Sequence, residues 1–379
     1  MSTQFSTLIS STLALLDQFQ GTLSTSSTVD SATTTTEDSS KDAKPLPLLA
    51  ASSAALRAQV TKLSLLAITA PFTHSAVSTV LRAVNDSVLP SLITAALLVT
   101  PGEYTKAYHS EVLVLSRNTL SEFSALVRLV NSLPEKGDQT PKDNSESKGA
   151  DEPPSQSEKD AITVAAGRVW DACDNLTAVA NKGVVGFVMF RVEQWRDLIR
   201  DAVEEIEEWD PEEDGDDFFD DLMGNESKPG DDDSDDDDVS DDEENTAKLQ
   251  EQKKTTLRLL KPIAQIYPAI INNRLKNAGE APLFATTSVA KLESLLLHLG
   301  EIPDQIDEVA GALYENDVSR STGFLKKIQK NATQAVTSVS APWKTVEASD
   351  KQPAEDKFTV WSKTWLKVMD EVSKSINAE

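Results

Sequence analysis

The stretch that decides the fold is residues 188–209, VMFRVEQWRDLIRDAVEEIEEW. Its main apolar positions are separated alternately by four and three residues, and they are Val188, Val192, Trp195, Ile199, Ala202, Ile206 and Trp209. This spacing predicts a helix with one continuous apolar face. We interpret that face as the buried side of a helix within a bundle. An intermolecular zipper is the alternative, although the pattern lasts for only about three heptads.

Helical periodicity also precedes this stretch. The residues on the three predicted apolar faces are Phe5, Ile9, Leu13, Leu16 and Leu23; Tyr104, Tyr108, Val112, Leu115, Thr119, Phe123, Leu126, Val130 and Leu133; and Ile162, Val169, Cys173, Leu176 and Ala180. Pro101 and Pro134 should bound the second of these helices. Ser157 should cap the third, with Asp160 at the capping-box position. Gly183 should interrupt the chain before the heptad stretch.

Four further helices are predicted towards the C-terminus. Their apolar faces are Leu249, Leu257, Leu260, Ile263, Tyr267 and Ile270; Ile302, Ile306, Val309 and Leu313; Phe324, Ile328, Ala332 and Ala335; and Phe358, Trp361, Trp365, Val368, Val372 and Ile376. Pro262 and Pro268 should kink or break the first of these helices, because proline removes a backbone donor. Pro303 should lie in the first turn of the second helix.

No segment alternates with the two-residue period of a strand, so the predicted fold class is all-α. We expect two helical bundles, one in residues 1–209 and one in residues 246–379, separated by an acidic tract at 210–245.

Three polar segments should lie outside the bundles and be disordered. Residues 22–46 are rich in Ser and Thr, residues 135–159 contain Ala150 as their only aliphatic side chain, and residues 210–245 are acidic. None of them can bury enough apolar surface to offset the entropy lost on ordering.

The formal net charge of −26 is concentrated in one place. Residues 204–244 contain 24 acidic side chains and one basic side chain, Lys228, so the rest of the chain is nearly neutral. A protein that binds nucleic acid directly would need a basic surface, which this balance argues against.

The single cysteine, Cys173, excludes an internal disulfide. No secretory signal is expected, because the first twenty residues lack a basic region and contain Asp17. No membrane span is expected either, because the longest apolar run is short and contains Pro90.

Catalytic, cofactor-binding and metal-binding motifs are not expected in this chain. His74, His109 and His298 are far apart and do not have metal-ligand spacing, and Cys173 lies on a predicted apolar face. An EF-hand-like run begins at Asp210, but Pro211 at its second position and Asp217 at its hydrophobic position argue against calcium binding. The sequence therefore indicates a protein that is not an enzyme.

The acidic tract permits three interpretations. It is a solubilising linker, a strip that attracts a basic partner, or a platform for phosphorylation. The apolar residues that a partner would contact are Phe218, Phe219, Leu222 and Met223. Ser234 and Ser240 each precede a run of acidic residues and are the candidate phosphorylation sites.

The order of these parts resembles the cyclin-D-binding family, also called Grap- and cyclin-D-interacting proteins. The resembling stretches are residues 169–176 (VWDACDNL), residues 191–205 (RVEQWRDLIRDAVEE), the acidic tract, and residues 259–267 (LLKPIAQIY). The resemblance implies an all-helical protein of the nucleus and cytoplasm that binds D-type cyclins and adaptor or transcription-related proteins. It also implies negative, Id-like regulation without direct DNA contact.

The predicted function is therefore a non-enzymatic regulatory interaction module of the cell cycle and transcription. One alternative is an acidic, chaperone-like binder of basic nuclear proteins such as histones. Another is a helical-bundle adaptor for the cytoskeleton or trafficking. The sequence does not determine the partner or the oligomeric state.

Overall fold

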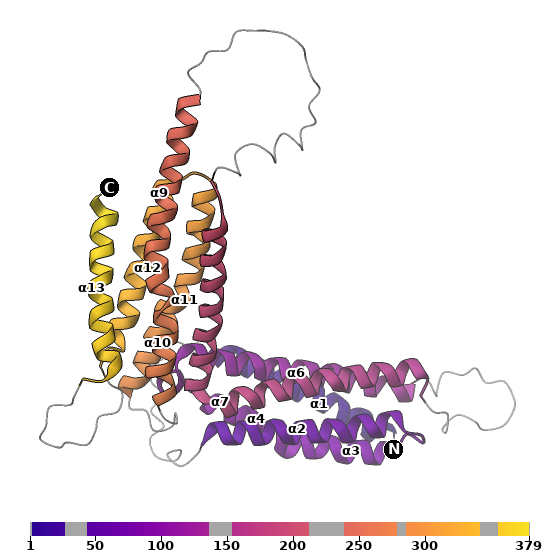
Figure 1. The fold of residues 1–379 in the computed structure, drawn as a ribbon. Coiled ribbons are helices and arrows are strands. Elements are labelled where there is room, and N and C mark those ends of the chain that lie inside the picture. Colours follow the sequence, from indigo (N-terminus) through magenta and orange to yellow (C-terminus); the bar gives the residue numbers. More distant parts are fainter. Residues whose placement is uncertain are drawn as a thin grey trace, which may run out of the picture. The chain divides into compact units, whose positions relative to one another are not determined.

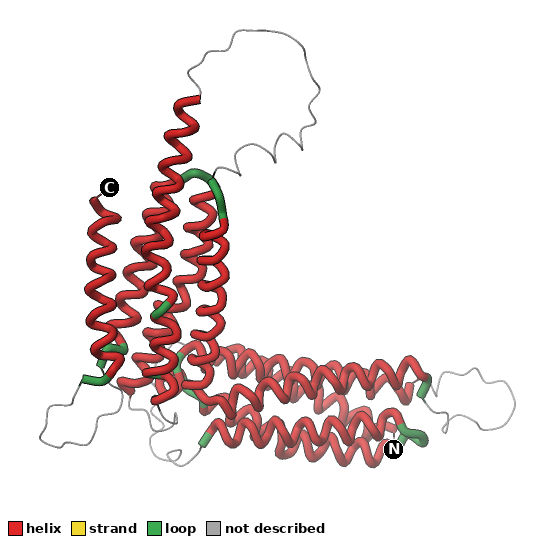
Figure 2. Tube along the Cα trace, in the orientation of Figure 1, coloured by secondary structure: helices red, strands yellow, loops and turns green. Residues whose placement is uncertain are grey.

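The computed structural model describes residues 2–26, 44–135, 154–211, 239–278, 286–341 and 355–378. Within these ranges all regular secondary structure is helical (Figures 1 and 2), so the all-α prediction is confirmed.

The chain divides into two compact units, Met1–Phe187 with Ala281–Thr286, and Val188–Glu280 with Thr287–Glu379. The boundary falls after Phe187 and not at residue 209, where the sequence analysis placed it. The helix that carries the heptad stretch is interrupted at Gly183, whose φ of 64° and ψ of −177° are not helical. This break separates the two halves of the helix, so residues 188–208 pack within the second unit.

The N-terminal unit is a bundle of long helices. Its elements are α1 (Ser2–Ser26), α2 (Pro45–Ile68), α3 (His74–Ala83), the π-helix η1 (Val84–Val88), α4 (Leu89–Leu98), α5 (Pro101–Tyr104), α6 (Lys106–Glu135) and the first half of α7 (Gln156–Glu208). Helix α1 packs against α3 and α6, and α2 packs against α4. The first half of α7 joins α2 through the Ser53 hydroxyl, which donates to the carbonyl of Cys173 at 2.9 Å.

Helix α7 begins with a capping box two residues earlier than predicted. The Glu158 amide donates to the Ser155 hydroxyl at 3.3 Å, and the Ser155 amide donates to the Glu158 carboxylate at 2.9 Å. The prediction of Ser157 and Asp160 as this pair is therefore wrong. The longer side chain of glutamate reaches back to the cap residue, as the motif requires.

One continuous helical stretch, His74–Leu98, is long and apolar enough to cross a membrane by length and composition alone. Half of its apolar window is buried inside the bundle. Pro90 follows η1 at the second position of α4. A proline cannot donate to the preceding turn, which accounts for the local change in helix geometry.

The edges of the three segments expected to be disordered are helical. Helix α1 continues through Ser26, and its hydroxyls at Thr22, Ser24, Thr25 and Ser26 donate to carbonyls four residues earlier. Helix α7 includes residues 156–159, and α9 (Val239–Ala264) includes residues 239–245. Acidic residues early in α9 suit a helix N-terminus. The remainders, 27–43, 136–153 and 212–238, lie outside the described residues.

The C-terminal unit contains the second half of α7 and six further elements. They are α9, α10 (Ile266–Asn273), the 3₁₀ helix η3 (Leu275–Asn277), α11 (Thr286–Tyr314), α12 (Val318–Ser338) and α13 (Lys357–Ala378). Helix α12 packs against α9 and α13, and α13 also contacts α10 (Figure 1). The predicted proline break is confirmed, because α9 ends at Ala264 and α10 begins at Ile266.

Pro303 lies inside α11, so its predicted place in a first helical turn is wrong. A proline leaves the carbonyl four residues earlier without its helical donor. Here that carbonyl belongs to Leu299, and the buried Tyr267 hydroxyl donates to it at 2.9 Å. This substitute donor allows α11 to continue past the proline.

Candidate protein-interaction surface

Most sequence-predicted site residues fall outside the described part of the chain. These are Phe218, Phe219, Leu222, Met223 and Ser234. Ser240 is the second residue of α9, where the structure describes the backbone but not the side chain. The partner-contact and phosphorylation predictions therefore stay predictions.

The described residues next to the acidic tract form an aromatic pair. Trp209 follows the end of α7, and its indole packs edge-on against Tyr314, the last residue of α11, with ring centroids 5.2 Å apart. The Tyr314 hydroxyl donates to Glu205 of α7 at 3.0 Å. Tyr314 is 43% exposed, so this pair offers an accessible aromatic surface in the C-terminal unit.

Further acidic side chains lie near Glu205, the carboxylate that accepts from Tyr314. Partial burial raises the pKa of Asp307 on α11, and the neighbouring carboxylates of Asp304, Glu205 and Glu308 raise it further. Arg320 forms ion pairs with Glu308 at 2.5 Å and Glu315 at 2.7 Å. No ion pair joins Asp307 to a cation among the described residues. The local negative charge is therefore only partly compensated, which favours contact with a basic group.

Two lysines of α9 hold the end of α7 in place. The Lys253 ammonium donates to the carbonyl of Trp209. The Lys261 ammonium donates to Glu207 at 2.8 Å. These bonds satisfy carbonyl and carboxylate groups at a helix C-terminus, where cations are favourable. We call Trp209, Tyr314, Glu205 and Asp307 together the aromatic–acidic surface.

The apolar face of residues 188–208 does not contribute to this surface. Val188, Val192 and Ile199 are fully buried, and Ile206 is 1% exposed. The indole of Trp195 packs against Gly300 of α11. The face thus packs inside its own bundle, which supports the bundle interpretation over the intermolecular zipper.

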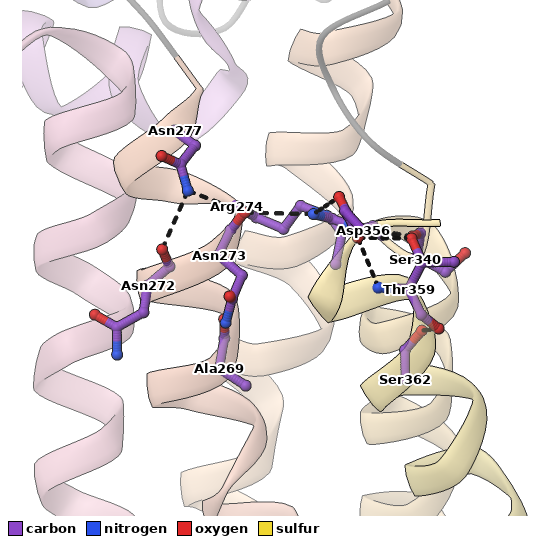
Figure 3. A network of polar contacts seen from close by, with 10 residues as sticks. Ala269, Asn272, Asn273, Arg274, Asn277, Ser340, Asp356, Thr359 and Ser362 are labelled. Carbon is purple, nitrogen blue, oxygen red and sulfur yellow. Dashed lines mark hydrogen bonds and ion pairs between the residues drawn. The ribbon is translucent and has the colours of Figure 1, made fainter. Parts of the chain in front are cut away.

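A polar network in the C-terminal unit has a structural role (Figure 3). Arg274 is 3% exposed and pairs through both terminal nitrogens with Asp356, at 2.7 and 3.1 Å. Its remaining donors contact the carbonyls of Val339 and Ser340. The guanidinium also lies over the Phe358 ring, 4.4 Å from its centroid. These contacts join α10 to the end of α12 and the start of α13.

Within this network Asp356 also caps α13. Its carboxylate accepts from the Thr359 amide at 2.7 Å and from the Thr359 hydroxyl at 2.8 Å. The hydrogen bonds from Arg274 and Thr359 lower the pKa of Asp356 to about 2. Asp356 therefore has a structural role, because its charged carboxylate accepts these hydrogen bonds.

His74, His298 and Cys173 make contacts within the fold. His74 packs edge-on against Phe5 and Phe72, and His298 contacts the side chain of Asn331 at 3.3 Å. Cys173 is buried, and burial raises its thiol pKa to about 11. The described residues contain no group of three or more potential metal ligands.

Sequence reasoning missed the aromatic–acidic surface because its members are far apart in the chain. Trp209 was assigned to the apolar face of α7, and Tyr314 follows Leu313 just outside the predicted face of α11. The available signal was that both aromatic residues stand at the ends of their helices beside carboxylates. Periodicity alone does not show which helix ends meet.

The fold and this surface define an all-helical protein with a candidate site for a protein partner. Residues 48–212 match the family model described as Grap2 and cyclin-D-interacting, N-terminal. The resemblance inferred from the sequence is thus confirmed over this stretch, which covers less than half of the chain and runs from α2 to just beyond Trp209. No curated protein matches the chain significantly.

Proposed function

We propose that this protein is a non-enzymatic regulatory interaction module that binds a cyclin-type protein, acting in the nucleus and cytoplasm on the cell cycle and transcription. The match of residues 48–212 to a family model named for cyclin-D and Grap2 interaction carries the proposal. The aromatic–acidic surface supports it, because Trp209 lies within the matched stretch and Tyr314 is accessible beside it. Aromatic side chains of this kind often anchor protein interfaces.

The binding test uses the full chain and a purified D-type cyclin. We expect saturable binding that Tyr314→Ala weakens, because the variant removes an exposed aromatic anchor. The matched control is Val114→Ala, which truncates a similarly exposed side chain, 47% exposed, in the N-terminal unit. Absence of cyclin binding by the full chain would overturn the proposal. If both variants weaken cyclin binding equally, the aromatic–acidic surface is not the site that binds cyclin.

A second candidate is an acidic binder of basic nuclear proteins, which the cluster of carboxylates around Asp307 supports, because among its neighbours only Glu308 pairs with a described cation. Deletion of residues 212–238 separates the two functions. Cyclin binding should survive the deletion and moderate salt, because it depends on packed apolar contacts. Histone binding should be lost under both conditions, because charge attraction is screened by salt. Tight histone binding without cyclin binding would favour this second function.

A further inference from the structure

The C-terminal helix α13 has a second apolar face that packs against no described element. Its first face is buried against α9, α10 and α12 through Phe358, Trp365, Met369 and Val372. The second face contains Val360, which is 53% exposed, and Val368, which is 42% exposed. Thr364 lies between them and is also exposed. Val360, Thr364 and Val368 are four residues apart and therefore form one ridge along the helix.

Polar and aromatic residues flank this ridge symmetrically about Thr364. Lys357 and Glu371 lie at equal distances in sequence on either side of it, and so do Trp361 and Lys367. Lys357, Lys367 and Glu371 are exposed and form no salt bridge within the described residues, whereas Lys363 pairs with Glu355 and Lys374 pairs with Asp370. Trp361 contacts Phe358 and Trp365 of its own helix, and Glu371 also interacts electrostatically with Lys374. The exposed charges of Lys357 and Glu371 are nevertheless opposite in sign and can pair across an interface.

We propose that this face binds a second copy of the protein, with the two α13 helices antiparallel and a two-fold axis at Thr364. In this arrangement Val360 of each copy lies near Val368 of the other. Lys357 is brought near Glu371 of the second copy, and Lys367 near Trp361. The first pairing is electrostatically favourable, and the second allows a cation–π contact. Both pairings occur twice, as a two-fold interface requires.

A parallel arrangement is disfavoured by the same residues. It would place Lys357 near Lys357 and Glu371 near Glu371, so that like charges face each other. A basic or acidic partner of uniform charge would likewise repel one end of the face. A second, antiparallel copy places an opposite charge beside both Lys357 and Glu371.

The contact is small, because one helix face contributes all of the named residues. Interfaces at the small end of the size range give weak complexes, and we expect a dissociation constant on the order of 10 μM. The dimer should therefore form in a concentration-dependent way and be missed in dilute samples.

Sedimentation equilibrium of the full chain over a range of concentrations tests the proposal. Val368→Asp should weaken the dimer at least about tenfold, because it places a charge in the apolar ridge. The matched control is Val114→Asp, which makes the same change at a 47% exposed position of α6 and should leave the dimer intact. A monomer at every concentration, or a dimer equally affected by both variants, would overturn the proposal.

Charge reversal tests the orientation of the helices. Glu371→Lys should weaken the dimer by about 2- to 30-fold, because each dimer contains two such pairs. The double change Lys357→Glu with Glu371→Lys should restore it, because both pairs are then rebuilt with exchanged signs. Failure of the double change to restore association would reject the antiparallel register.

Cross-linking tests the position of the axis. Under mild oxidation, Thr364→Cys should form a disulfide between copies, because the two positions meet at the axis. Ser121→Cys on α6 provides an exposed control that should stay monomeric under the same conditions. Equal cross-linking of both variants would show random collision and reject the predicted axis.

Discussion

Trp195 and Gly300 are in direct contact inside the C-terminal unit. A β-carbon at Gly300 would lie 2.9 Å from Cζ2 and 3.1 Å from Cη2 of the indole. Real contacts of a β-carbon are longer than this, so the second half of α7 approaches α11 closely because residue 300 lacks a side chain. The contact fixes the heptad face of α7 within the bundle.

Gly300→Ala should therefore destabilise the protein by about 1–3 kcal/mol, because the added methyl group collides with the indole of Trp195 and displaces it from its packed position. Gly311→Ala on the same helix is the matched control, since a β-carbon there meets nothing within 4 Å. This control should gain about 0.5–1 kcal/mol from higher helix propensity. Urea denaturation of both variants measures the difference, and equal effects would contradict the contact.

Trp195→Ala should cost about 3 kcal/mol, because it removes a large side chain that packs in the bundle. In the double variant with Gly300→Ala, the second change should cost less than it does alone, because the colliding ring is absent. An unchanged denaturation midpoint for Trp195→Ala, together with lost association measured by light scattering, would instead indicate an intermolecular zipper.

Tyr267→Phe should destabilise the C-terminal unit by about 1–3 kcal/mol, because the carbonyl of Leu299 then has no donor beside Pro303. The penalty should shrink in the double variant with Pro303→Ala, because an alanine amide can restore the helical hydrogen bond. Thermal melts of the original protein, the two single variants and the double variant measure the coupling between the two changes. Additive effects would show that the tyrosine hydroxyl does not compensate for the proline.

The sequence predicted those parts of the fold that depend on local backbone chemistry. The break at Gly183 was predictable because glycine readily adopts positive φ. The break after Pro262 was predictable because two nearby prolines disrupt helical bonding. The helical class followed from apolar spacing alone.

Features that depend on contacts distant in sequence could not be predicted. The local sequence predicted Pro303 in a first helical turn, whereas the hydroxyl of Tyr267 explains how α11 continues through this proline. The unit boundary at Phe187 was missed because α7 has helical periodicity on both sides of Gly183. Periodicity shows that a face is buried but does not identify the helices that bury it.

Acid should weaken the contact between Arg274 and Asp356 in a defined pH window. The pKa of Asp356 is lowered to about 2 in the folded protein, whereas the pKa of an unfolded aspartate is about 3.9. A lowered pKa gives stabilisation that is present above the unfolded value and is lost as pH falls towards the folded value. Asp356→Asn should therefore be less stable than the original protein at neutral pH, and the difference should shrink between about pH 4 and pH 2.

Urea midpoints measured across this range test the prediction. Asp370→Asn is a suitable control, because Asp370 pairs with Lys374 on the surface and both side chains are mostly exposed. Such pairs contribute little, so this control should differ from the original protein only slightly at any pH. A difference for Asp356→Asn that persists at pH 2 would show that the charge of the carboxylate is not what stabilises the junction.

Fragment folding should depend on where the second unit begins. A fragment that starts at Thr246 lacks residues 188–208, whose apolar face is buried through Val188, Val192, Ile199 and Ile206. It would expose the surface of α11 around Gly300, against which Trp195 packs. We expect this fragment to be helical but to lack a cooperative melt, because exposed apolar surface no longer has its partner helix. A fragment of residues 184–379 should retain the cooperative transition. Circular dichroism melts compare the two fragments, and the 184–379 fragment carrying Trp195→Ala should be intermediate. If the shorter fragment melts as cooperatively as the longer one, the unit boundary lies at residue 209.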